Sequence, residues 1–259
     1  MQGSRAELGV NGIRVETYGE PSSRPPLLFV HGGCQGSWAW HKIAPELASD
    51  GWYSVCLNWF GHNGSATLHP GLALKRSILD VTAEIAEVAD FLGKVPVVIG
   101  HSMGGLASLT FATIRPVAAL VLLVPVVPAG FAADPISLEV DPNAMWIPPA
   151  QMMDHAWWGE ASAEEAQHYS SLVCPESPQA VMEATRWLCE VETRQLRVPA
   201  LVFAAENDVL VPPQAVNALA KAIEADFVEL RNTGHGVPLN PVWAQVTTQI
   251  NEWLEMNCT

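Results

Sequence analysis

The sequence predicts an α/β fold with a doubly wound, mostly parallel sheet and a helical insert. Short apolar runs alternate with longer segments whose apolar residues recur at helical spacing, which is typical of parallel strands joined by helices. The alternation stops after residue 124 and resumes at residue 200, which indicates the insert. Apolar residues occupy 49% of the 259 positions, which is enough to bury the core of one such domain.

The elements of the core follow from local signals. Asn11-Gly12 favours a tight turn, so residues 8–19 are expected to form an antiparallel hairpin that begins the sheet. Segment 77–92 has apolar residues at helical spacing, and Gly93 suits the end of that helix. Further strands are expected at 27–31, 53–57, 95–99, 118–124, 200–205 and 227–230. Further helices are expected at 38–49, from the turn at 100–105 to 114, at 213–224 and at 241–254.

The insert divides the chain into a core of residues 1–128 and 196–259 and a helical segment of residues 129–195. Prolines punctuate its first part, and it contains no convincing strand. Its Trp and Met side chains suit the wall of an apolar pocket of roughly a few hundred Å³. Trp146, Trp157 and Trp158 are the expected lining residues. The alternative, in which they only attach the insert to the core, stays open.

Residues 100–104 read G-x-S-x-G between an apolar run and a helical segment. A serine on so sharp a strand-to-helix turn needs small neighbours, and Gly100 and Gly104 supply that room. The pattern therefore predicts that Ser102 is an exposed nucleophile. The competing interpretation is a glycine-rich turn that happens to contain a serine.

A serine hydroxyl becomes a good nucleophile when a base takes its proton and an acid orients that base. Asp208 and His235 each follow an apolar run, in the chain order serine, acid, histidine that this motif requires. They are therefore the predicted acid and base. Glu206, beside Asp208, and Asp134, after the run at 118–124, are the rival acids.

Together these motifs resemble the α/β-hydrolase family over nearly the whole chain. Residues 31–40 read H-G-x-x-x-G-x-W-x-W, which resembles the branch of methylesterases, hydroxynitrile lyases and related bacterial ester hydrolases. The resemblance implies a catalytic triad of Ser102, Asp208 and His235, and an oxyanion hole formed by the backbone N–H groups of Gly33 and Met103. It also implies that the insert is a helical cap over the site.

The implied function is a serine hydrolase that cleaves a carboxylic ester or a lactone through an acyl-enzyme. Eleven acidic residues against two arginines in the cap disfavour an anionic substrate, so a small to medium, largely apolar, neutral molecule is expected. In the alternative, these acids only solvate the outer face of the cap. Two other classes stay open: a lyase, perhydrolase or cofactor-free oxygenase on the same scaffold, and a ligand receptor that retains the triad.

Composition excludes several other classes. A net charge of −14 argues against nucleic acid and anionic membrane surfaces, and no apolar stretch reaches the roughly 18 residues of a membrane span. Residues 1–7 have no apolar run, so we expect no signal peptide, a cytoplasmic location and free thiols. A Cys174–Cys189 bridge stays open. No metal-ligand spacing and no nucleotide-binding glycine motif occur, so neither a metal nor a cofactor is expected. His31 and His101 are assigned structural roles, and the ring of His101 is expected to point away from the acyl site. The oligomeric state is left open.

Overall fold

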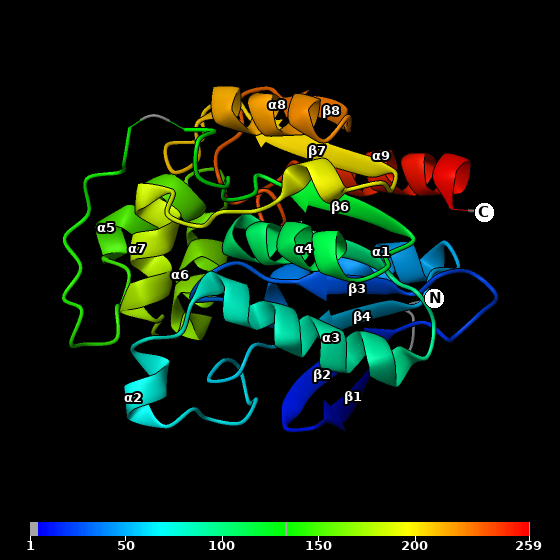
Figure 1. The fold of residues 1–259 in the computed structure, drawn as a ribbon, viewed down its shortest axis with the longest axis horizontal. Coiled ribbons are helices and arrows are strands. Elements are labelled where there is room, and N and C mark those ends of the chain that lie inside the picture. The colour runs from blue at the N-terminus through cyan, green and yellow to red at the C-terminus, as the bar shows by residue number, and fades with distance from the viewer. Residues whose placement is uncertain (1–4, 133, 259) are drawn as a thin grey trace.

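The computed structural model describes residues 5–132 and 134–258, and an eight-stranded sheet runs through these residues (Figure 1). The strands lie in the order β1-β2-β4-β3-β5-β6-β7-β8. The pairs β1–β2 and β2–β4 are antiparallel, and every later pair is parallel. The predicted fold class is therefore confirmed. Residues 1–4, on which the signal-peptide prediction partly depends, lie outside the described residues.

The strands match the predicted runs closely. They are β1 (Arg5–Val10), β2 (Ile13–Tyr18), β3 (Leu27–Val30), β4 (Ser54–Leu57), β5 (Val97–His101), β6 (Ala119–Leu123), β7 (Ala200–Ala205) and β8 (Asp226–Leu230). Asn11 (φ 48°) and Gly12 (φ 86°) form the predicted hairpin turn, in which both central residues need a positive φ. Strand β5 begins two residues later than predicted, because Pro96 has no N–H to donate to the sheet.

Helices cover both faces of the sheet. They are α1 (Ile43–Ser49), α2 (Pro70–Ala73), α3 (Val81–Leu92), α4 (Ser102–Ile114), α8 (Pro213–Ala222) and α9 (Trp243–Asn257), with α5 to α7 in the insert. Helices α3, α4 and α8 pack with one face of the sheet in one buried apolar cluster, and α1 and α9 pack with the other face in a second. The sequence did not predict α2. The predicted helices at 38–49 and 77–92 each begin with a separate 3₁₀ turn, at Ser37–Trp40 and Ile78–Asp80.

The segment between β6 and β7 carries α5 (Ala150–Met152), α6 (Ala163–Leu172) and α7 (Pro178–Arg186), which lie together beyond one end of the sheet (Figure 1). Within its described residues, the β structure consists of an isolated antiparallel bridge between Trp146 and Glu176. Ser162 and Ser177 cap α6 and α7 by accepting backbone N–H groups of their first turns. We use the name cap for this segment, residues 129–195.

Helix α4 lies very close to the end of β3, and glycine makes this approach possible. A Cβ atom on Gly104 would lie 2.1 Å from the carbonyl oxygen of His31 and 2.5 Å from that of Val30. Both neighbours are backbone atoms, so neither can rotate away. The second glycine of the G-x-S-x-G motif is therefore required for α4 to reach the sheet.

Gly104→Ala is expected to lower the free energy of unfolding by about 3 kcal/mol or more, as overpacking against a fixed backbone does. Chemical denaturation monitored by circular dichroism measures this change. Gly9→Ala is the matched control, because a Cβ on Gly9 would meet no atom within 4 Å. Equal stability of the two variants would contradict the assigned role of Gly104.

Candidate active site

Ser102 stands at the turn between β5 and α4, where the backbone is forced into the left-handed region with φ 54°. A Cβ on Gly100 would lie 2.6 Å from the carbonyl oxygen of Gly104, so the turn closes tightly around the serine. This conformation is uncommon for a residue with a side chain, and such strain is typical of functional sites. The turn projects the serine side chain out of the end of the sheet, toward the cap.

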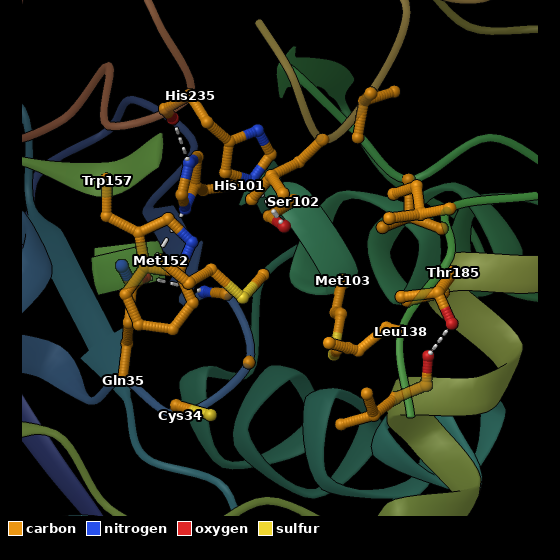
Figure 2. A pocket seen from close by; sticks show the side chains of 18 of the residues that line it. Cys34, Gln35, His101, Ser102, Met103, Leu138, Met152, Trp157, Thr185 and His235 are labelled. Carbon is orange, nitrogen blue, oxygen red and sulfur yellow. Dashed lines mark hydrogen bonds between the residues drawn. The ribbon is translucent and has the colours of Figure 1, made fainter. Parts of the chain in front are cut away.

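The structure brings Ser102, His235 and Asp208 into one hydrogen-bonded chain (Figure 2 shows the first two). Ser102 Oγ lies 2.8 Å from His235 Nε2, and His235 Nδ1 lies 2.7 Å from Asp208 Oδ2. An ionised carboxylate only accepts hydrogen bonds, so Nδ1 carries the ring proton. Nε2 is then free to accept the proton of the Ser102 hydroxyl. This geometry is that of a nucleophile, a base and an orienting acid.

The loop after β7 fixes Asp208 in place. Its Oδ1 accepts the backbone N–H groups of Leu210 (2.8 Å) and Val211 (2.9 Å), which leaves Oδ2 for the histidine. Of the rival acids, Glu206 is exposed and accepts hydrogen bonds from Arg231 and the backbone of Asn232. Asp134 is also exposed, and its backbone carbonyl accepts the indole N–H of Trp187. Neither rival is hydrogen-bonded to His235 in the part of the chain that the structure describes.

Gly33 and Met103 both lie beside Ser102 in the wall of the same pocket. Met103 belongs to the first turn of α4, where backbone N–H groups have no partner within the helix. Gly33 follows β3, and a Cβ there would lie 2.5 Å from the sulfur of Met103. Glycine therefore allows this loop to approach the first turn of α4. The two residues whose N–H groups the resemblance implies as donors therefore line the same pocket as the nucleophile.

The pocket lies between the core and the cap, and it is mostly apolar (Figure 2). Of the predicted tryptophans, Trp146 and Trp157 line it. Trp158 does not: it is buried against Trp38 and Tyr169 and donates its indole N–H to Ser170. The cavity holds about 60 Å³, less than the few hundred Å³ predicted, because side chains such as Met103 and Met152 occupy the space beside Ser102.

His101 lies closer to the site than predicted. Its ring does not point away but lines the pocket, 5.1 Å from the ring of His235 between centroids. Burial and the neighbouring His235 lower the pKa of His101 to about 3, so the ring is neutral and donates from Nε2 to the carbonyl oxygen of His235. His101 therefore holds the backbone of the base. His31 has the predicted structural role, since its Nε2 accepts the backbone N–H of Trp59.

Three cap carboxylates point inward, which the acidic composition alone did not reveal. Glu160 accepts the backbone N–H of Gly234, next to His235. Glu176 accepts the backbone N–H of Cys34, next to Gly33. Glu183 accepts the backbone N–H of Ile78 at the start of the α3 region. The interpretation that the cap acids only solvate its outer face is therefore wrong for these three residues. Each binds a backbone group of the core instead.

The cysteines are unpaired in the described residues. Cys189 is buried, and Cys174 contacts the carbonyl oxygen of Cys34 at 3.5 Å through its thiol, so the Cys174–Cys189 bridge that the sequence left open is not formed.

The described chain also holds no group of three or more His, Cys, Asp or Glu side chains suited to a metal ion. No helix in these residues has the length and apolarity needed to cross a membrane.

A nucleophile elbow, an acid after β7 and a histidine after β8, on a doubly wound sheet, define the structural class of the α/β hydrolases. Comparison with known proteins agrees. The chain belongs to the alpha/beta hydrolase family, whose family model matches residues 27–244. The predicted resemblance is therefore confirmed.

Individual relatives place the chain near esterases and lipases. Lipase LipV of Mycobacterium tuberculosis is 30% identical over 260 residues, covering 87% of this chain and 92% of its own. Methylesterase 3 of Arabidopsis thaliana is 29% identical over 98 residues, and the match spans only 34% of each chain. A thermophilic esterase from Thermogutta terrifontis has the same fold, with a TM-score of 0.74 at 20% identity, over 99% of this chain and 100% of that one.

Proposed function

We propose that this protein is a serine hydrolase that cleaves a carboxylic ester or a lactone. The observation that carries the proposal is the hydrogen-bonded chain from Ser102 Oγ through His235 to Asp208, open to a pocket lined mainly by apolar side chains. The similarity to a lipase and a methylesterase supports the same class of substrate.

The reaction proceeds in two halves on this geometry. Ser102 Oγ attacks the carbonyl carbon while His235 Nε2 takes the hydroxyl proton, and Asp208 stabilises the charged imidazole. The N–H groups of Gly33 and Met103 bind the negative oxygen of the tetrahedral intermediate. Collapse of this intermediate breaks the C–O bond, and His235 returns the proton to the departing alcohol. His235 then activates a water molecule that releases the acid and restores Ser102.

The walls of the pocket define the substrate class. Within the described chain, none of the residues that line it is Asp, Glu, Lys or Arg. A charged group entering this pocket would lose its hydration without gaining a charged partner, so a neutral, largely apolar molecule fits best. The limited volume favours small acyl groups, and the flexible side chains of Met103 and Met152 can rearrange for somewhat larger ones. We propose that residues 129–195 act as the cap that sets this selection.

Turnover of a panel of neutral esters and lactones tests the proposal. Wild-type protein is expected to hydrolyse short-chain esters with stoichiometric release of acid and alcohol. A ligand receptor would bind such molecules without turnover, and a lyase or perhydrolase would give products other than acid and alcohol. Absence of ester and lactone hydrolysis across the panel would refute the proposed function.

The cap tryptophans give a test of substrate selection. Trp146→Ala and Trp157→Ala are expected to change the relative kcat/KM for acyl groups of different bulk by about tenfold or more, because both side chains form the pocket wall. Trp158→Ala is the matched control, since its side chain packs between the cap and Trp38 of the core and does not line the pocket. Its expected effect is lower stability with an unchanged rank order of substrates.

Kinetics with a chain-length series of p-nitrophenyl esters, together with thermal unfolding, separates these effects. If Trp158→Ala changed the rank order and the other two variants did not, the assignment of the pocket wall would be wrong.

A further inference from the structure

The cap binds both backbone groups of Cys34, its N–H and its carbonyl oxygen, in the loop after β3. Glu176 Oε2 accepts the N–H of Cys34 at 3.0 Å, and the N–H of Cys174 donates to the carbonyl oxygen of Cys34 at 3.0 Å. Cys34 itself has φ 62°, a left-handed conformation that is costly for a residue other than glycine. Such a conformation persists where the surroundings hold it. Here the surroundings that hold it belong to the cap.

Glu176 lies directly behind the proposed oxyanion hole. A Cβ on Gly33 would lie 3.4 Å from Glu176 Oε2, so the carboxylate is in contact with the peptide that joins Gly33 to Cys34. Its other oxygen, Oε1, accepts the backbone N–H of Ser177 at 2.8 Å. The residue is only 1% exposed, which means that its orientation is fixed by these contacts and not by solvent.

His62 is the partner that keeps this buried carboxylate charged. It comes from the core loop after β4, is 3% exposed, and its Nε2 lies 3.1 Å from Glu176 Oε2. Burial lowers the pKa of His62, but the charge of Glu176 and the hydrogen bonds to Glu176 and Cys174 together outweigh this effect and raise that pKa to about 10. Burial likewise acts to raise the pKa of Glu176, yet the charge of His62 and the hydrogen bonds lower it to about 2. The two groups therefore form an ion pair across the ordinary pH range.

We propose that Glu176, held by His62, is a positioning residue that sets the Gly33–Cys34 peptide and thereby the oxyanion-hole N–H of Gly33. The inference rests on the proposed function, because it concerns the same site. It means that the cap does more than cover the pocket. Docking of the segment 174–176 onto the loop after β3 completes the oxyanion hole, so cap position and transition-state stabilisation are coupled.

A carboxylate suits this task for a physical reason. A charged acceptor forms a shorter and stronger hydrogen bond to a backbone N–H than a neutral one, and two fixed donors define its position. Misplacement of an oxyanion donor by about 1 Å can cost on the order of 10² in rate. An apolar contact at this position would cover the loop without specifying where the peptide lies.

Glu183 provides a matched comparison within the same cap. It is also buried, and it also accepts a core backbone N–H, that of Ile78 at 2.8 Å. It is absent from the pocket wall: its Oε2 accepts from Ser77 and Ile78 at the start of the α3 region, and its Oε1 accepts from Gln179 within the cap. Glu183→Gln therefore weakens cap-to-core attachment without touching the catalytic loops. A difference between the two glutamine variants reports on the oxyanion hole and not on the cap as a whole.

The experiment compares Glu176→Gln, His62→Gln and Glu183→Gln with wild type in kcat and KM for a short p-nitrophenyl ester between pH 5 and 9. Glu176→Gln is expected to lower kcat about 10- to 100-fold with KM changed by less than about threefold, since an oxyanion-hole donor acts on the transition state. The effect is expected at every pH. Glu183→Gln is expected to keep the wild-type kcat.

His62→Gln adds a pH signature that a purely structural role would not produce. Without the positive ring, burial raises the pKa of Glu176, because no charge offsets the loss of hydration. Below that raised pKa the carboxyl group is protonated and a weaker acceptor, so kcat falls toward the level of Glu176→Gln as pH decreases. Above it, kcat recovers. Wild type keeps Glu176 ionised throughout and lacks this additional acid limb.

The other titratable groups that face Glu176 and His62 are the same in all the proteins compared. The charged or titratable neighbours are His31, Cys34, Cys174, Arg76 and Glu84. Burial lowers the pKa of His31 well below its usual value and raises that of the Cys34 thiol well above it, so both stay neutral. Arg76 and Glu84 form their own buried ion pair. The three glutamine variants leave these groups in place.

A second readout needs no turnover. A fluorophosphonate reacts when Ser102 Oγ bonds to phosphorus, fluoride leaves and His235 takes the proton, and its phosphoryl oxygen occupies the oxyanion hole. Glu176→Gln is expected to slow this labelling about 10-fold or more relative to Glu183→Gln. Should Glu176→Gln not fold, Glu176→Asp, which retracts the charge by one methylene group, is used in the same comparison.

Equal labelling rates in wild type and the Glu176 variant would overturn the positioning role, whether or not esters are hydrolysed. Wild-type labelling without ester or lactone turnover would refute the proposed function alone, and slower labelling of the Glu176 variant would still support the coupling. A wild type that is not labelled would overturn both.

Discussion

Ser102→Ala is expected to lower kcat/KM for an ester substrate by on the order of 10⁴–10⁶, as loss of the nucleophile does in enzymes with this arrangement. The hydroxyl is the atom that bonds to the acyl group, and His235 Nε2 lies 2.8 Å from it. Alanine fits the elbow, because the tight approaches at the turn involve Gly100 and Gly104 and not the side chain at 102. Steady-state kinetics measures the loss of kcat/KM, and circular dichroism checks that the variant is folded.

Ser108→Ala is a control for this experiment. Ser108 lies farther along α4, is fully buried, and donates to the carbonyl oxygen of Gly104. Ser108 is absent from the residues that line the pocket, so turnover should stay within about threefold of wild type. Retention of more than about a tenth of wild-type turnover by Ser102→Ala would refute the acyl-enzyme mechanism. It would leave the fold assignment intact.

Asp208→Asn is expected to lower kcat by about 10²–10⁴. Asparagine can present its amide N–H₂ to His235 Nδ1, and the ring then carries its proton on Nε2. In that tautomer Nε2 cannot accept the proton of Ser102. The carboxylate also stabilises the charged imidazole that forms during attack, and a neutral amide does so less well.

Glu206→Gln is the matched control, because it makes the same chemical change two residues away. Glu206 is exposed and bonded to Arg231 and the Asn232 backbone, so its loss should change kcat by less than about threefold. The test compares kcat of Asp208→Asn and Glu206→Gln with the same ester at the same pH. If Glu206→Gln were the strongly impaired variant, Asp208 would not be the acid of this site.

The sequence by itself determined the fold class and the positions of the catalytic candidates, because these depend on local and periodic signals. Apolar runs that alternate with helical spacing specify parallel strands joined by helices. In such a sheet the carboxyl ends of the strands meet at one edge, so residues just after the runs, such as Asp208 and His235, had to lie near the turn that carries Ser102. Glycines at 100 and 104 marked that turn, since no other residue leaves room for it.

Only the tertiary structure decided what the cap does with its side chains. The cap segment around these tryptophans is irregular, so no periodicity indicates which way a residue points. Trp158 packs against Tyr169 and Trp38, whereas Trp146 and Trp157 line the pocket. Glu176 looked like one surface acid among eleven, although it is buried against His62, which lies 114 positions earlier in the chain. A buried charge is stable only with a partner, and such a partner is found through contacts between distant segments, which composition and spacing do not encode.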